Sequence, residues 1–223
     1  MEDETNNNLG KELLDLIKLR RSVRQFDGRK IPREKILSII ESGIWAPTGC
    51  NNQELRFLVI DKEEKISEII KFKPFFKGVA AVVLIFCDMS LPMSRKIYRK
   101  KKASRHLCYI DTGLALTNMV NFAKNIGIDS CIFNLSEYHR KEEKKKSRIK
   151  KFINKIKIKL NLHATIEENF EFFLRKNLEI PGHLKIMCGV VFGFADKYPD
   201  VTSEMHGGKR ILREKVERYM VKE

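Results

Sequence analysis

The sequence predicts a layered domain of the α/β or α+β class, in which helices cover a β-sheet. Segments with helical apolar spacing alternate along the 223 residues with short runs rich in β-branched and aromatic side chains. One run, residues 79–86, is almost entirely apolar, as expected of a central strand buried on both faces. Hydrophobic residues make up 43% of the chain, enough for a substantial core. We expect residues 1–223 to form a single domain.

Helical spacing predicts helices at residues 9–19, 33–42, 62–71, 107–125, 167–178 and 209–219. Pro32 stands just before the second helix, where proline is tolerated. Gly127 suits the C-cap of the fourth. In that fourth helix we expect the apolar stripe to run through Ile110, Leu114, Thr117, Met119 or Val120, and Phe122.

Strands are predicted at residues 56–61, 79–86, 130–134 and 186–194. Gly189 and Gly193 in the last strand indicate that other groups approach its backbone closely. Residues 26–29 are expected to form a turn, and residues 46–53 a loop of small and polar residues.

The formal net charge of +15 is concentrated in two segments. Residues 139–159 hold eleven Lys or Arg and two Glu, and residues 95–105 hold seven basic residues and no acid. Ile149, Phe152, Ile153 and Ile156 recur in the first segment, as in an amphipathic basic helix. A solvated basic cover is the favoured interpretation, and an anionic membrane or nucleic acid is the alternative partner. Nucleic acid is disfavoured because Phe152 is the only aromatic residue available for base stacking there.

Five cysteines are scattered and never spaced as a Cys-x-x-Cys pair. We therefore expect reduced thiols in a cytoplasmic protein, with no disulfide framework and no metal site. Residues 1–8 are acidic and polar, unlike a signal peptide, and the longest apolar run is too short to cross a bilayer.

Residues 20–24, Arg-Arg-Ser-Val-Arg, place three guanidiniums and a hydroxyl together. Guanidinium forks suit phosphate and carboxylate oxygens. Taken alone, the stretch is better explained as a basic helix C-terminus that interacts with the helix dipole.

Four segments in this order resemble the nitroreductase family of flavin enzymes. Residues 20–24 resemble its Arg-Arg-Ser-x-Arg motif, and residues 46–53 resemble its Ala-Pro-Ser-x-x-Asn-x-Gln loop. The helix from Asp111 to Gly127 with the strand after it, and residues 189–194 followed by Lys209 and Arg210, complete the pattern. The chain departs from the family at Glu54 and Leu55, where Pro-Trp is usual, and at Cys50, where a small residue is usual.

The resemblance implies an α+β fold: a three-layer α-β-α sandwich with a mostly antiparallel or mixed central sheet. It also implies an entwined homodimer that binds FMN at the subunit interface. Residues at about 137–174 would be a basic, lid-like insertion over the flavin.

The resemblance further assigns the cofactor-binding residues. Arg20, Arg21, Ser22 and Arg24 would bind the phosphate, ribityl chain and ring edge of FMN. Pro47, Thr48, Gly49 and Asn51 would reach the flavin of the partner subunit. Cys131, Ile132, Phe133 and Asn134 would line the ring near N5, and Lys209 and Arg210 would close on the phosphate. Clustered guanidiniums suit both a phosphate dianion and the negative charge of a reduced flavin.

The implied function is an FMN-dependent oxidoreductase. It would pass hydride from NADH or NADPH through flavin N5 to a small electron-poor substrate in a ping-pong reaction. No side chain need act as a nucleophile, so we assign no catalytic residue. The histidines are dispersed: His106, His139, His163, His183 and His206. Cys50 and Cys131 are interpreted as packing residues, and Asp111 as either a flavin contact or a helix cap. The alternative is a degenerate flavoprotein scaffold that binds an anionic membrane surface or nucleic acid through its basic segment.

Overall fold

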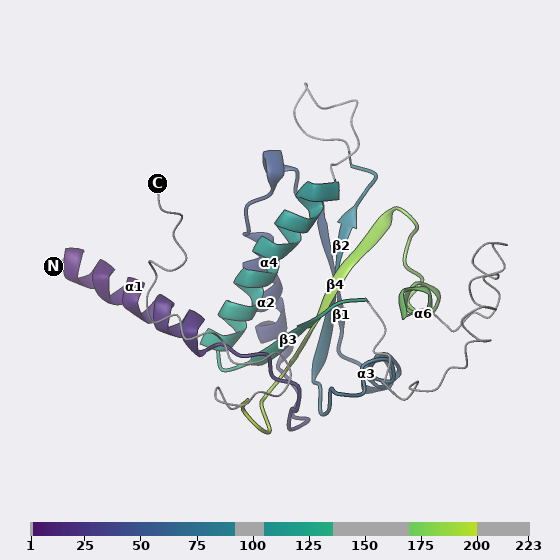
Figure 1. Cartoon of the computed structure of the whole chain (residues 1–223), viewed down its shortest axis with the longest axis horizontal. Coiled ribbons are helices and arrows are strands. Elements are labelled where there is room, and N and C mark those ends of the chain that lie inside the picture. The colour runs from purple at the N-terminus through teal and green to yellow at the C-terminus, as the bar shows by residue number, and fades with distance from the viewer. Residues whose placement is uncertain (1, 92–104, 136–169, 200–223) are drawn as a thin grey trace, which may run out of the picture.

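The computed structural model of the chain describes residues 2–91, 105–135 and 170–199 (Figure 1). Everything below concerns these residues. The predicted basic segment at 139–159 and the predicted helix at 209–219 lie outside them. The last residues of the predicted insertion, 170–174, are described and belong to a helix.

Four strands form one antiparallel sheet in the order β1-β2-β4-β3. They are β1 (Leu55–Ile60), β2 (Ala81–Asp88), β3 (Asp129–Phe133) and β4 (Leu184–Gly193). All four predicted strands are confirmed, with boundaries within two residues of the prediction. Because β3 lies at one end of the order, one of its edges is not covered by a sheet neighbour.

Helices cover both faces of this sheet (Figure 1). On one face lie α2 (Arg33–Ile44) and α4 (Arg105–Asn125); on the other lie α3 (Glu63–Ile70) and α6 (Phe170–Asn177). This is the layered α+β arrangement that the sequence predicted. Helix α1 (Glu2–Leu19) projects from the body and begins earlier than predicted, since residues 2–8 carry no apolar period. No helix among the described residues is long and apolar enough to cross a membrane.

Strand β2 explains the unbroken apolar run. Its alternate side chains enter two cores: Val82, Leu84 and Phe86 face α3 and α6, and Ala81, Val83 and Ile85 face α2 and α4. All eight residues of the strand are buried. Each large apolar side chain buried in this way contributes about 1.5–3 kcal/mol. An antiparallel strand therefore needs an apolar residue at every position when helices cover both faces.

The predicted stripe of α4 is confirmed at Met119 and Val120, which are buried, and is wrong in its first half. The buried face of α4 passes through Cys108, Ala115 and Met119, while Ile110 is 58% exposed on the opposite face. Leu114 and Thr117 are also exposed. The error arose because α4 has apolar residues on both faces, so the spacing alone does not identify the face that packs on the sheet.

Aromatic rings approach the backbone of Gly189 and Gly193 in β4, which confirms the predicted close approach. A Cβ at Gly189 would lie 2.1 Å from the Phe133 ring, and one at Gly193 would lie 2.6 Å from the Phe26 ring. Phe133 belongs to β3, and Phe26 follows the arginine stretch at residues 20–24.

Candidate functional site

The arginine stretch lies along the outer edge of β3. Ser22 forms a parallel bridge with Ser130, and the Val23 N–H donates to the Ser130 carbonyl at 3.0 Å. Phe26 forms a second bridge, with Ala195 just after β4. Two segments predicted to bind one cofactor are therefore side by side, although about a hundred residues separate them in the sequence.

Arg20, Ser22 and Arg24 all lie close enough to the buried thiol of Cys131 to influence its pKa. Burial raises the pKa of Cys131, while the charge of Arg24, a hydrogen bond with Ser22 and the charge of Arg20 act in the opposite direction. The Arg24 guanidinium also donates to the Ser22 carbonyl at 3.3 Å. These three side chains therefore form one positively charged group beside β3.

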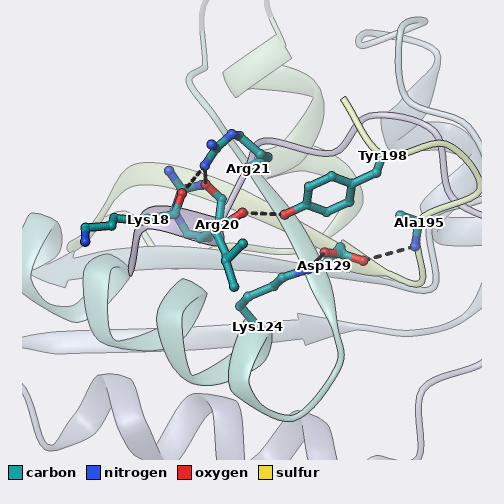
Figure 2. Close-up of polar contacts among 8 residues, drawn as sticks. Lys18, Arg20, Arg21, Lys124, Asp129, Ala195 and Tyr198 are labelled. Carbon is teal, nitrogen blue, oxygen red and sulfur yellow. Dashed lines mark hydrogen bonds and ion pairs between the residues drawn. The ribbon is translucent and has the colours of Figure 1, made fainter. Parts of the chain in front are cut away.

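Arg21 plays a different role. Its Nη1 donates to the carbonyls of Lys18 and Arg20, at the C-terminal end of α1 (Figure 2). The contacts of Arg21 are those expected of a basic residue at a helix C-terminus. Its guanidinium reinforces the last turn of α1, where carbonyl groups lack helical partners.

A polar network fixes the end of α1 against α4 and β4 (Figure 2). Tyr198 Oη donates to the Leu19 carbonyl at 2.6 Å, and Lys124 Nζ lies 2.9 Å from Asp129 Oδ1. The other Asp129 oxygen accepts from the Ala195 N–H at 3.3 Å. Burial acts to lower the pKa of Lys124, but hydrogen bonds to Asp129 and Tyr198 outweigh it and the pKa is raised. The network holds the arginine stretch in register with β3.

The four predicted ring-lining residues alternate in exposure. Cys131 and Phe133 are buried in the core, whereas Ile132 and Asn134 are exposed. Phe133 packs against the rings of Phe76 and Phe170, at centroid distances of 5.9 and 6.2 Å. A ligand beside β3 would therefore meet the side chains of Ile132 and Asn134 and the backbone, and not the side chains of Cys131 and Phe133.

The predicted loop residues lie at the other end of the molecule. Gly49 begins a short 3-10 turn, η1 (Gly49–Asn51), and its N–H donates to both oxygens of Asp111 at 3.1 Å. Thr48 Oγ1 accepts from the Gln53 N–H at 3.0 Å, while Pro47 and Asn51 are exposed. Asp111 thus holds the loop to α4, a role that neither of its two sequence interpretations included.

The structure does not bring the loop and the arginine stretch together within one chain. Asp111 anchors the loop near the start of α4, and Lys124 anchors the network near its end. At 1.5 Å per residue, these anchors are about 20 Å apart along the helix. Lys209 and Arg210, predicted to close on the phosphate, lie outside the described residues.

Sequence reasoning missed a buried polar cluster beneath the loop. The Glu54 side chain is 1% exposed, and its Oε2 has no hydrogen-bond partner among the described residues. Burial raises the pKa of Glu54, and the adjacent Asp111 carboxyl raises it further. Cys87 and Cys108 lie beside Glu54 and are joined as a disulfide, contrary to the expected free thiols. The two cysteines are 21 residues apart in different elements, so their spacing in the sequence did not predict the pairing.

Similarity to known proteins follows the same segments. The Nitroreductase family model matches residues 17–79, which hold the arginine stretch and the loop. A Bacillus subtilis protein provisionally named NAD(P)H nitroreductase YdgI is 34% identical over 84 residues, which cover 35% of this chain and 40% of that protein. Over these residues the chain is similar to the nitroreductase family.

Other nitroreductase relatives extend the match. An Archaeoglobus fulgidus protein, provisionally named NADH dehydrogenase/NAD(P)H nitroreductase, is 29% identical over 137 residues, covering 60% of this chain and 72% of that protein. A solved FMN-dependent nitroreductase of Clostridium difficile is 17% identical, with a TM-score of 0.58 over 83% of this chain and 88% of that one. That likeness shows the shared nitroreductase fold. The chain spans less than half the length of the first curated relatives that it matches.

Proposed function

We propose that this chain is a member of the nitroreductase family and an FMN-dependent oxidoreductase that works as a homodimer. It takes hydride from NADH or NADPH and delivers it to a small electron-poor substrate in a ping-pong sequence. One observation carries the proposal: the arginine stretch pairs with the start of β3, so Arg20, Ser22 and Arg24 gather at the strand edge that faces away from β4.

The residues at this edge fit the chemistry of FMN. When bound, FMN supplies the two-electron hydride chemistry, and the chain supplies binding, orientation and charge. Arg20 and Arg24 provide guanidiniums for phosphate oxygens and for the negative charge of a reduced ring. Asn134 and Ile132 are exposed on the same strand, so they can contact a planar ligand.

The backbone of β3 adds a directed donor. The Val23 N–H binds the Ser130 carbonyl, so the peptide groups of Ser130 face the outer edge. Peptide groups of alternate residues in a strand point to the same edge, and therefore those of Ile132 also face outward. The Ile132 N–H is in a position to bind a ring heteroatom, which would orient the flavin against the sheet.

Two copies of the chain would complete the site. The arginine stretch and the loop lie at opposite ends of α4, so a ligand that contacts both must lie between subunits. Apolar side chains are exposed where a second copy could cover them: Leu9, Leu13, Leu14 and Ile17 on α1, Tyr109, Ile110 and Leu114 on α4, and Trp45, which is 79% exposed. An α-helix that is apolar on both faces is normally buried on both, and α4 has this character. In the dimer, Pro47, Thr48, Gly49 and Asn51 of one subunit would approach the flavin held by the other.

The test is the visible spectrum of the purified chain after FMN is added and the excess is removed. We expect bound flavin that bleaches anaerobically with NADH or NADPH, and the faster donor identifies the physiological one. Arg24→Ala should weaken FMN binding by about 10–150-fold, the loss of one charge-assisted hydrogen bond. Arg33→Ala is the matched control, because Arg33 at the start of α2 forms an exposed ion pair with Asp61 and lies outside the proposed site. Failure of the wild-type chain to retain flavin at any concentration would refute the proposal.

A further inference from the structure

We propose that the reduced thiols of Cys87 and Cys108, together with the Glu54 carboxylate, form a binding site for one zinc ion. The site lies beneath the 46–53 loop and is separate from the proposed flavin site beside β3. It does not depend on the proposed function.

The three donors come from different parts of the fold. Cys87 is near the end of β2, Cys108 is in the first turn of α4, and Glu54 directly precedes β1. Their ligand atoms all lie within 4.8 Å of one another, and all three side chains are buried. The sheet fixes two of them: the Asp88 N–H donates to the Glu54 carbonyl at 2.9 Å, next to the β1–β2 pair of Leu55 and Cys87.

The orphaned Glu54 oxygen is the independent observation that points to a ligand. A disulfide gives no charge to a carboxylate, yet a Glu54 carboxylate oxygen lies within 4.8 Å of the two sulfurs, and Oε2 of that carboxylate is buried without a hydrogen-bond partner among the described residues. An unsatisfied buried carboxylate oxygen is costly, and such groups are normally paired or bound to metals. A cation between the carboxylate and the sulfurs would satisfy that oxygen.

The donor set selects the metal. Two thiolates and one carboxylate suit Zn²⁺, which binds Cys sulfur and Glu oxygen in tetrahedral sites, whereas Mg²⁺ and Ca²⁺ take oxygen ligands. Three protein ligands leave the fourth position to water. Asp111 contacts the Glu54 carboxyl and also accepts from Gly49, so it would orient the ligand and link the metal to the loop. Met89 and Met187 pack against the cysteine pair as an apolar shell.

The disulfide and the zinc complex are alternative states of the same pair. Two equivalents of a cellular thiol reduce the S–S bond: the disulfide gains two electrons and two protons, and the thiols leave as their own disulfide. Zn²⁺ then replaces the two thiol protons, which are released to solvent. Oxidation of the pair would reverse this and expel the metal.

The experiment measures zinc binding to the full-length chain. The protein is reduced with a phosphine, desalted without oxygen and titrated with Zn²⁺ against a chromophoric chelator. Co²⁺ serves as a spectroscopic probe, because sulfur ligation gives a charge-transfer band and tetrahedral geometry gives intense visible bands. The variants are Glu54→Gln, Cys108→Ser and Asp111→Asn. Cys188→Ser is the matched control, since Cys188 lies in another core cluster.

We expect one zinc per reduced chain and none per oxidised chain. Cys108→Ser should abolish binding and the Co²⁺ sulfur band, and Glu54→Gln and Asp111→Asn should weaken binding by roughly 10–100-fold. Cys188→Ser should bind as the wild type does. Melting temperatures separate lost ligands from lost folding: zinc should raise the melting temperature of the reduced wild type, raise that of Glu54→Gln less, and leave that of Cys108→Ser unchanged. The proposal is overturned if the reduced wild type binds no zinc, or if Cys108→Ser binds it unchanged.

Discussion

Gly189→Ala tests the packing that holds β3, the strand beside the proposed flavin site, in place. An added Cβ would lie 2.1 Å from Cζ and 2.6 Å from Cε1 of Phe133. Carbon atoms in good contact are about 3.5–4.0 Å apart, so the ring must move by more than about 1 Å. Phe133 is 5% exposed and has the rings of Phe76 and Phe170 around it, so it has little room to move.

The expected loss of stability follows from two opposing effects. Overpacking of a core costs about 1–3 kcal/mol. Replacing glycine by alanine restricts the unfolded chain and returns about 0.4–1 kcal/mol. We therefore expect the free energy of unfolding to fall by about 1–2 kcal/mol, and the melting temperature to fall by about 2–8 °C for a chain of this size. Because the ring is on β3, displacement should also weaken FMN binding beside that strand.

Urea unfolding followed by circular dichroism measures this change. Gly182→Ala is the matched control, because a Cβ there meets no atom within 4 Å. It should change stability by less than about 0.5 kcal/mol, or raise it slightly. The double variant Gly189→Ala, Phe133→Leu should recover part of the loss, since leucine vacates the space the Cβ needs. An unchanged urea midpoint for Gly189→Ala would refute the proposed contact between β4 and the ring.

Three further predictions address the interface, the polar network and the core. Ile110→Glu places a charge on the exposed face of α4, and light scattering should show a shift from dimer to monomer with the fold intact. Lys124→Met leaves Asp129, whose side chain is 11% exposed, without its cation; urea unfolding should show a loss of about 1–3 kcal/mol. Burial raises the pKa of Cys188 from 9.0 to about 12. Between these values only the folded chain keeps the thiol proton, so stability falls as pH rises. Between about pH 9 and pH 11, the free energy of unfolding of Cys188→Ala should therefore fall by about 2 kcal/mol less than that of the wild type.

The strands could be predicted because their signal is local. Strand β2 is apolar at every position before Asp88 and contains three β-branched residues, so its type and its burial could be predicted from local residues. The pairing of β3 with the arginine stretch is different, since it joins Ser22 to Ser130 through backbone groups that every residue has. The family resemblance, and not the residue pattern, was what placed these two segments at one site.

The two faces of α4 show why a single sequence misleads about burial. Periodicity reports which residues are apolar, not which neighbour covers them. The face with Ala115 and Met119 packs on the sheet, and the face with Ile110 is exposed in the single chain. The predicted stripe included residues of the second face because α4 is apolar on both faces. The cluster of Glu54, Cys87 and Cys108 escaped notice for a related reason: its members meet only after β1, β2 and α4 are packed.

Division of the proposed site between the two ends of α4 has a thermodynamic consequence. If the flavin is held by Arg24 of one subunit and by the Gly49 loop of the other, FMN binding and dimerisation are linked. Each must strengthen the other by the same factor. Dilution below the dimer dissociation constant should then weaken FMN binding, and excess FMN should shift the dissociation constant downward. FMN affinity that does not depend on protein concentration, while light scattering shows the dimer dissociating, would place the whole site within one chain and contradict the separation that α4 imposes.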